Sequence, residues 1–323
     1  MNLPRRRFLH LAAGAVAFPA VSGVARAQAY PARPVRIVVG FPPGIGPDII
    51  ARLVGQRLSV EFGQQFVIEN RPGAGSNIGT EVVVEAPPDG YTLLWTAAAN
   101  AINATLYPDL NFNFIRDITP VAPAAHTLFV MVVNPSVPAK TVPEFIAYAK
   151  ANPGKLNMVS PGNGTAPHIF GELFKMMAGV DLVHVPYRGD YMSDLLGGRV
   201  QVAFNPVSST IEFIRAGKLQ ALAVTTVTRQ EALPDTPPLG EFLPGYEASG
   251  WQGIGAPKNT PAEIIDRLNK EINAAVTDPQ VKARFAEIGV EPMSMTPVEF
   301  GKFIADETEK WATVIKFAGI KPL

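Results

Sequence analysis

Two segments of this 323-residue chain repeat one pattern, a buried strand followed by a glycine-rich loop and the start of a helix. In the first, an apolar run at 35–39 leads to the loop PGIGPD at 43–48, and apolar residues then recur at helical spacing. In the second, a strand at 156–159 leads to SPGNGT at 160–165 and to a helix over 166–179. The pattern predicts an α/β fold with helices packed on mostly parallel sheets.

Each junction also predicts an anion-binding site. The first N–H groups of a helix have no partner inside the helix, and the helix dipole adds positive character there. A carboxylate or a phosphate suits such a site equally well. Glycine and proline also occur at strand–helix turns only to make the turn, so one junction alone leaves both interpretations open. The repetition in a separate part of the chain favours two facing turns that hold one ligand.

Composition excludes several classes of protein. The chain has no cysteine, which removes disulfides, thiolate metal sites and a cysteine-linked lipid anchor. The histidines beyond the N-terminal segment, His126, His168 and His184, share no metal-ligand spacing, so we expect neither a metal nor another cofactor. Without residues 1–27 the chain carries 24 basic and 28 acidic residues, a net charge near −4. It has no basic stripe for nucleic acid.

Residues 1–27 have the features of a secretory signal peptide. Three arginines at 5–7 precede a small-residue apolar stretch at 11–21, and an Ala-x-Ala site ends at Ala27. The run Arg-Arg-x-Phe-Leu is similar to a twin-arginine export signal, although general export signals also carry arginines. The apolar stretch is shorter than the ~20 residues that a membrane span needs. We expect a mature protein that begins near Gln28 and is soluble in the periplasm.

The order of strands and helices predicts two domains with a cleft between them. The first domain is expected to take residues 28–126 and 250–323, and the second to take residues 127–249. The chain would cross between them near 126–134 and return near 249–256. We expect Thr96 to Asn100 to form a loop just past the carboxyl end of a strand, where open α/β sheets bind ligands.

Further motifs carry a family resemblance across essentially the whole mature chain. They are YPARPVRIVV at 30–39, PGIGPD at 43–48, VIENRPGAG at 67–75, PDGYTLL at 88–94, SPGNG at 160–164, HVPY at 184–187, LLGG at 195–198, AGKL at 216–219, and Trp251. The sequence resembles the substrate-binding receptors of tripartite tricarboxylate transporters, the Bug-type receptors. The resemblance implies a type II periplasmic binding protein fold (a Venus flytrap) that closes on a small, usually carboxylated ligand between two α/β domains.

The resemblance also implies a set of ligand-binding residues by position. These are Pro43, Gly44, Gly46, Thr96 and Asn100 in the first domain, and Ser160, Gly162, Asn163, Gly164, Thr165, Tyr187 and Asn205 in the second. His168, in the first turn of the second-domain helix, is expected either to line the cleft or to face a neighbouring helix. Asp48 is expected to cap its helix and brace its loop, because a carboxylate would repel an anionic ligand. His184 is expected to be packed at a strand end.

Three positions depart from the family pattern. Ile45 and Pro47 replace the usual Gly and the usual Thr or Ser, which removes a hydroxyl and an N–H from the first loop. The segment at 190–193 is about two residues shorter than usual. Asn205 stands where Asp is common, which removes a partner for a ligand ammonium. We therefore expect an aromatic or aliphatic carboxylate as ligand rather than an amino acid.

The expected function is an exported receptor that captures a carboxylate and delivers it to a tripartite tricarboxylate-type membrane permease. The receptor is expected to act as a monomer, with hinge closure favoured by ligand contacts to both domains. A sensor that presents its ligand-bound form to a membrane signalling partner is a second interpretation. An exported hydrolase is a third, but the sequence has no Gly-x-Ser-x-Gly elbow, Cys/His pair or metal cluster. We therefore expect no enzymatic activity.

Overall fold

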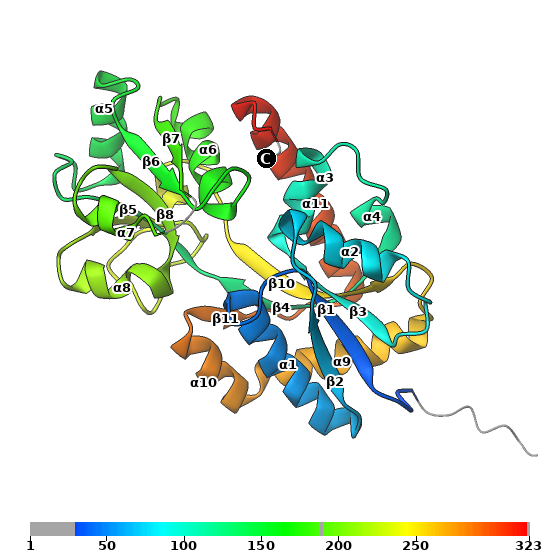
Figure 1. Ribbon diagram of the computed structural model, residues 1–323. Helices are drawn as coiled ribbons and strands as arrows, with labels where there is room; N and C mark the ends of the chain where they lie inside the picture. Colours follow the sequence, from blue (N-terminus) through cyan, green and yellow to red (C-terminus); the bar gives the residue numbers. More distant parts are fainter. Residues whose placement is uncertain (1–29, 188–189, 322–323) are drawn as a thin grey trace, which may run out of the picture.

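The computed structural model describes residues 30–187 and 190–321. Figure 1 shows two lobes, each built on its own sheet and covered by helices. This is the two-lobed α/β architecture that the sequence predicts. The expected signal peptide at 1–27 and the expected start at Gln28 lie outside the described residues. Within the described ranges, no helix combines the length and the hydropathy needed to cross a membrane.

The first lobe contains a six-stranded mixed sheet. Its strands are β1 (Val35–Val39), β2 (Phe66–Asn70), β3 (Thr92–Ala97), β4 (Ile118–Thr127), β10 (Gly250–Pro257) and β11 (Val290–Pro292), in the order β11-β4-β10-β3-β1-β2. Strands β1, β2 and β3 run parallel, whereas β10 and β11 pair antiparallel with their neighbours. Its helices are α1 (Gly46–Phe62), η1 (Ala74–Ser76), α2 (Asn77–Val84), α3 (Ala98–Leu106), α4 (Phe114–Asp117), α9 (Ala262–Thr277), α10 (Pro279–Glu287) and α11 (Pro297–Ala318).

The second lobe contains a five-stranded sheet. Its strands are β5 (Phe129–Val133), β6 (Asn157–Ser160), β7 (Val183–Pro186), β8 (Val202–Pro206) and β9 (Gln220–Val224), in the order β7-β6-β8-β5-β9. Strand β6 runs parallel to β7 and β8, while β5 pairs antiparallel with β8 and β9. Its helices are α5 (Val142–Ala151), α6 (Ala166–Ala178), α7 (Met192–Leu196), α8 (Val207–Arg215) and η2 (Leu239–Glu241). The expected domain boundaries at 126/127 and 249/250 stay a prediction.

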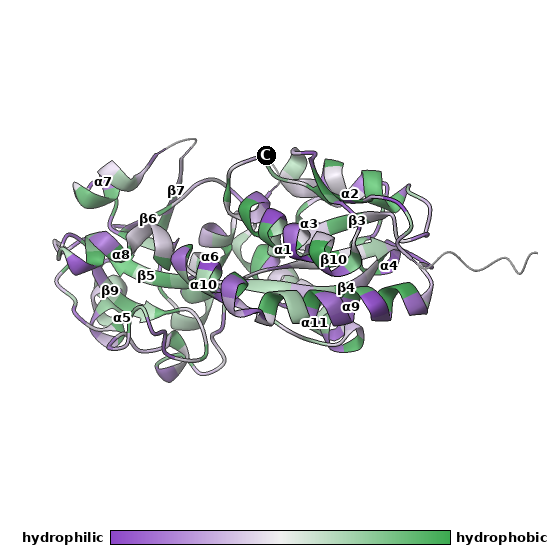
Figure 2. Ribbon diagram, turned by 90° about the horizontal axis from the view of Figure 1, so that it is seen from below, coloured by the Kyte–Doolittle hydropathy of each residue, from purple (hydrophilic) through white to green (hydrophobic). Residues whose placement is uncertain are grey.

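Buried strands and amphipathic helices form the core of each lobe. Strand β5 is fully buried, and Figure 2 shows it as a hydrophobic run, whereas α9 and α11 carry both hydrophobic and hydrophilic residues. Helix α11 is fixed to β10 through Glu307, whose Oε2 accepts hydrogen bonds from Trp251 Nε1 at 3.2 Å and Trp311 Nε1 at 2.9 Å. Lys310 pairs with the same carboxylate. This buried polar cluster joins the returning strand to the C-terminal helix.

Two first-lobe elements were not expected from the sequence. Strand β4 contains Pro120 and Pro123, and proline within an apolar run argues against a strand. The structure accommodates both prolines where the register with β10 shifts, which is the position of β-bulges. The expected loop at Thr96 to Asn100 is wrong, because β3 extends to Ala97 and α3 begins at once. Asn100 Oδ1 accepts a hydrogen bond from Ala97 N at 2.8 Å and so fixes this abrupt junction.

A pair of glycine substitutions tests the packing of α11 against β10. A Cβ at Gly253 would lie 2.6 Å from Ala122 O and 2.6 Å from Phe300 Cζ, whereas a Cβ at Gly301 has its nearest contact, Pro120 Cγ, at 3.4 Å. We expect Gly253→Ala to lower the free energy of unfolding by about 1–3 kcal/mol. Gly301→Ala, inside helix α11, should leave it unchanged or raise it by up to about 1 kcal/mol. Urea unfolding measures both, and equal effects would contradict this packing.

Candidate functional site

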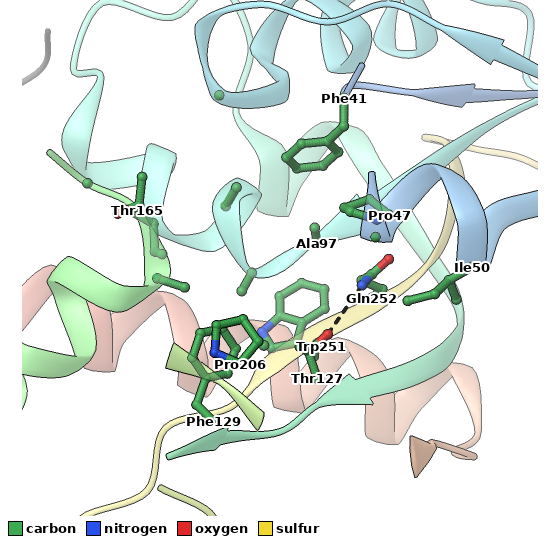
Figure 3. Close-up of a pocket in the computed structure, with 18 of the residues that line it drawn as sticks. Phe41, Pro47, Ile50, Ala97, Thr127, Phe129, Thr165, Pro206, Trp251 and Gln252 are labelled. Atoms are coloured by element: carbon green, nitrogen blue, oxygen red, sulfur yellow. Dashed lines mark hydrogen bonds between the residues drawn. The ribbon is translucent and has the colours of Figure 1, made fainter. Parts of the chain in front are cut away.

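A cavity of about 650 Å³ lies between the two lobes. Figure 3 shows side chains from both lobes around it, including Phe41 and Pro47 from the first lobe and Thr165 and Pro206 from the second. On the returning strand β10, Trp251 lies between these two groups and Gln252 lies on the side of Pro47. The volume is typical of a small-molecule site. The two glycine-rich loops therefore contribute to one cavity.

Four helices begin at this cavity, two from each lobe. The lining includes Gly46 at the start of α1, Ala98 of α3, Thr165 next to α6 and Ser208 of α8. Among the described residues, no side chain caps the first turn of α1, α6 or α8. The positive ends of these helix dipoles therefore meet around one space. The first turns keep only some free N–H groups, because Pro47 and Pro167 have none and the N–H groups of Asp48 and Val207 donate to Ile45 O and Leu128 O. This arrangement favours a bound anion.

The side chains that line the cavity are neutral and mostly apolar. None of the described lining residues is Asp, Glu, Lys, Arg or His. Apolar surface comes from aromatic and branched side chains of both lobes, namely Phe41, Ile49, Ile50, Ile102, Leu106, Phe129, Trp251, Ile288 and Val290. An anion in this cavity would be held by dipoles and hydrogen bonds, and its uncharged part would contact an apolar wall.

In the first loop, Gly46 and Pro47 line the cavity, whereas the sequence-predicted Pro43 and Gly44 do not. Asp48 Oδ2 accepts hydrogen bonds from Gly44 N at 2.8 Å and Arg52 Nε at 2.9 Å. Burial favours the neutral form of Asp48, but the bonds from Arg52, Gly44 and Asn70 outweigh this effect and hold the pKa of Asp48 below its usual value. The expected loop-bracing role of Asp48 is confirmed, whereas its expected helix-capping role is wrong, because α1 has no side-chain cap.

In the second loop, Asn163, Gly164 and Thr165 line the cavity. The N–H of Gly164 donates to His168 Nδ1 at 3.0 Å, so this N–H is occupied by the protein itself. Because Nδ1 accepts this bond, neutral His168 carries its proton on Nε2, which lies 3.6 Å from Glu172 Oε1. Asn163, by contrast, makes none of the hydrogen bonds found within the described residues. Asn163 is therefore the polar residue of this loop best placed to meet a ligand.

The predicted residues Ser160 and Gly162 belong to the same loop but do not line the cavity. Ser160 Oγ lies 2.6 Å from His184 Nε2 and donates to Gly162 O at 3.0 Å. The rings of His184 and His168 stack with centroids 3.6 Å apart and planes at 7°. His168 is buried and forms part of this support rather than of the cavity wall. His184 is packed at the end of β7, as expected.

Four further predicted residues also lie outside the cavity lining. Thr96 is buried and lines a smaller space beside α11, and Asn100 Nδ2 donates to Thr80 Oγ1 at 2.9 Å. Tyr187 donates through its hydroxyl to Asp194 Oδ2 at 2.5 Å. Asn205 Oδ1 accepts from the Tyr191 hydroxyl at 2.8 Å. Ligand contacts by these side chains stay a prediction.

Several lining residues were not found from the sequence. Thr127, Ser208, Ser209 and Gln252 supply hydroxyl and amide groups to the cavity. Gln252 carried a usable signal, because it is a polar residue in the otherwise apolar strand β10. The serines precede no recognisable motif, so only the structure brings them to the site. Trp251 serves two purposes, since it lines the cavity and bonds to Glu307 through its indole N–H.

Comparison with known proteins agrees with this geometry. Residues 50–320 match the model of the tripartite tricarboxylate transporter family receptor, TctC. The chain belongs to this receptor family. Protein BugT of Bordetella pertussis is 36% identical over 312 residues, which cover 94% of this chain and 96% of BugT. The resemblance to Bug-type receptors is thus confirmed.

Solved structures of similar proteins show the same fold. An R. palustris protein solved with adipate is 35% identical and has a TM-score of 0.76, covering 91% of this chain and all of that protein. MatC from Rhodopseudomonas palustris, solved with bound malate, is 28% identical with a TM-score of 0.73, covering 88% of this chain and all of MatC. This TctC family receptor therefore has the type II periplasmic binding protein fold. It is a solute-binding protein and not an enzyme.

The stacked histidines of this receptor predict a loss of stability in mild acid. Burial is the main cause that lowers the pKa of His184 from 6.5 to about 4, against an opposing effect of the Glu172 carboxylate. As the pH falls from 6.5 to 4, the unfolded chain binds a proton that the folded protein does not. The free energy of unfolding should therefore decrease across this window.

Urea unfolding at several pH values between 7.5 and 4 measures this effect, and His184→Gln provides the comparison. The variant should be less sensitive to pH over the same window, although His126, whose pKa burial also lowers, titrates in both proteins. An equal loss of stability in wild type and variant would contradict the assignment.

Proposed function

We propose that this receptor captures a small aliphatic or aromatic carboxylate in the cavity between its lobes and delivers it to a tripartite tricarboxylate-type membrane permease. It would do so as a monomer in the periplasm, after cleavage of its signal peptide near Ala27. The observation that carries the proposal is the meeting of four helix starts, two from each lobe, at one cavity without a charged side chain among its described lining residues.

The energy available at such a site is sufficient for useful affinity. A hydrogen bond to a charged group contributes about 1.5–3 kcal/mol, and a helix terminus adds about 0.3–2 kcal/mol. Micromolar binding requires about 8 kcal/mol. Four or five donors drawn from both lobes would supply about 6–15 kcal/mol before ordering costs. Gly46 and Asn163 line the cavity and are the first candidates for such contacts, whereas the hydroxyl and the N–H of Thr165 both donate to Gly162 O.

The cavity lining supports a carboxylate over an amino acid. An ammonium group needs an anionic or strongly accepting partner, and none of the described lining side chains is acidic. This support replaces the sequence-based argument from Asn205, whose side chain lies outside the lining and accepts from Tyr191. The two R. palustris proteins solved with adipate and malate show that receptors of similar sequence hold organic acids without an ammonium group.

A thermal-shift panel tests the proposed function directly. Mature protein is heated with adipate, malate, benzoate, aspartate and glutamate, and native mass spectrometry of the freshly purified protein identifies any acid that co-purifies. A ligand at 100 times its dissociation constant adds about 2.7 kcal/mol, which is a shift of several degrees at this chain length. We expect shifts with non-amino acids only. Tight binding of aspartate or glutamate with no response to the other acids would refute the proposed ligand class.

A matched pair of glycine substitutions tests closure of the two lobes. Gly164 and Gly179 both have a positive φ, at 73° and 62°, so alanine strains the backbone at either position. A Cβ at Gly164 would collide with Leu106 Cδ2 of the other lobe, whereas a Cβ at Gly179 has nothing within 4 Å. Gly164→Ala should weaken binding of the best acid by about tenfold or more, because the side chain keeps the lobes apart. Isothermal titration calorimetry should show near wild-type affinity for Gly179→Ala, and equal losses would contradict the closure contact.

A further inference from the structure

One hydrogen bond determines how the amide of Gln252 faces the cavity. Gln252 lies on β10 with 5% of its surface exposed. The indole Nε1 of Trp95, a fully buried residue on the neighbouring strand β3, donates to Gln252 Oε1 at 2.9 Å. An indole N–H is a donor only, so the atom that it meets must be the amide oxygen. The amide nitrogen of Gln252 is therefore the end directed away from Trp95.

The amide nitrogen of Gln252 has at least one N–H group available to a ligand. Its one partner among the described residues is Thr127 Oγ1, at the long distance of 3.5 Å (Figure 3). An amide nitrogen carries two N–H groups, so at least one remains for a ligand. Thr127 accepts in this contact, which leaves its own hydroxyl hydrogen to donate. Both residues line the cavity, and both offer donors to it.

This pair lies away from the second-lobe loop. In Figure 3, Thr165 lies at one side of the cavity and Gln252 at the other, with Trp251 between them. Gln252 is also the strand neighbour of Ala97, the residue before α3. A ligand whose carboxylate meets the loop at 163–165 can thus place a second group near Gln252, across an apolar wall.

We infer that Gln252, oriented by Trp95 and assisted by Thr127, is a specificity-determining residue that requires a hydrogen-bond acceptor at this end of the ligand. The inference rests on the proposed function and narrows it to acids with a second oxygen acceptor, such as a carboxylate or a carbonyl oxygen. A second group that only donates, such as an ammonium, is disfavoured, because it would face the N–H groups of Gln252 while the amide oxygen is held by Trp95. A purely apolar end leaves the Gln252 donor unpaired.

The experiment compares three acids of one chain length by isothermal titration calorimetry. Adipate ends in a second carboxylate, hexanoate in a methyl group and 6-aminohexanoate in an ammonium. Wild-type protein should bind adipate about tenfold to a hundredfold more tightly than hexanoate, the range expected for a hydrogen bond to a charged group. It should bind 6-aminohexanoate most weakly of the three.

Gln252→Glu reverses the chemistry at constant shape. One carboxylate oxygen still accepts from Trp95, while the other replaces the donor nitrogen with a negative acceptor. Adipate affinity should fall by about a hundredfold, hexanoate affinity should stay within about threefold, and 6-aminohexanoate affinity should rise by about tenfold. Trp95→Phe frees the amide to turn over, so the preference for adipate over 6-aminohexanoate should shrink.

Gln201→Glu is the matched control, because Gln201 holds strand ends together outside the cavity. Its Oε1 accepts from Asn157 N at 2.9 Å and its Nε2 donates to Gly198 O at 2.7 Å. This variant should keep the wild-type order of the three acids even where its melting temperature falls. A merely structural role of Gln252 would likewise change stability and leave the order of the acids intact.

The outcomes separate the inference from the proposed function. If wild-type protein binds adipate and hexanoate equally well, or if Gln252→Glu lowers the affinity for both by the same factor, the role of Gln252 is refuted and the receptor proposal stands. If wild-type protein binds no acid of this series or of the thermal-shift panel, the proposed function fails, and the role of Gln252 fails with it.

Discussion

A negative charge can enter an apolar cavity only where fixed dipoles replace the water that it loses. In this protein, we propose that the replacement comes from the main chain, because the described cavity lining contains no cationic side chain. Helices α1, α3, α6 and α8 all begin there. The remaining architecture serves this convergence, since each sheet fixes the direction of its helices and the crossing strands β4 and β10 bring the two sets together.

The two glycine loops are supported by the same device, although their sequences differ. In each loop, an acceptor side chain four residues further along holds a glycine N–H: Asp48 accepts from Gly44, and His168 accepts from Gly164. Each acceptor is itself held by further partners, which are Asn70 and the half-exposed Arg52 for Asp48, and the buried Glu172 for His168. These titratable residues thus hold the loops in place at the helix starts and do not line the cavity.

Much of the fold could be predicted from the sequence, because strand–loop–helix junctions leave local signals. Strand β1 and helix α6 occur at the residues expected from the two strand–loop–helix junctions. Strand β4 could not be predicted in this way, since its prolines are tolerated only through bulges against β10, a strand more than 100 residues away in sequence. Helix α3 was missed because its N-cap residue is Ala97, which has no capping side chain, and the bond from Ala97 N to Asn100 Oδ1 fixes the helix start instead.

The candidate site could be predicted only in part. The loop residues Gly46, Asn163, Gly164 and Thr165 line the cavity, and their glycine-rich segments are visible in the sequence. The groups contributed by crossing strands and by α8 depend on long-range pairing, which no local pattern encodes.

The placement of the three tryptophans has a consequence for the fluorescence of the protein. Trp251 borders the cavity and Trp95 bonds to a cavity amide, whereas Trp311 is buried in the core. The intrinsic tryptophan fluorescence of the unlabelled protein therefore contains one signal that reports a ligand in the cavity and one that serves as an internal reference.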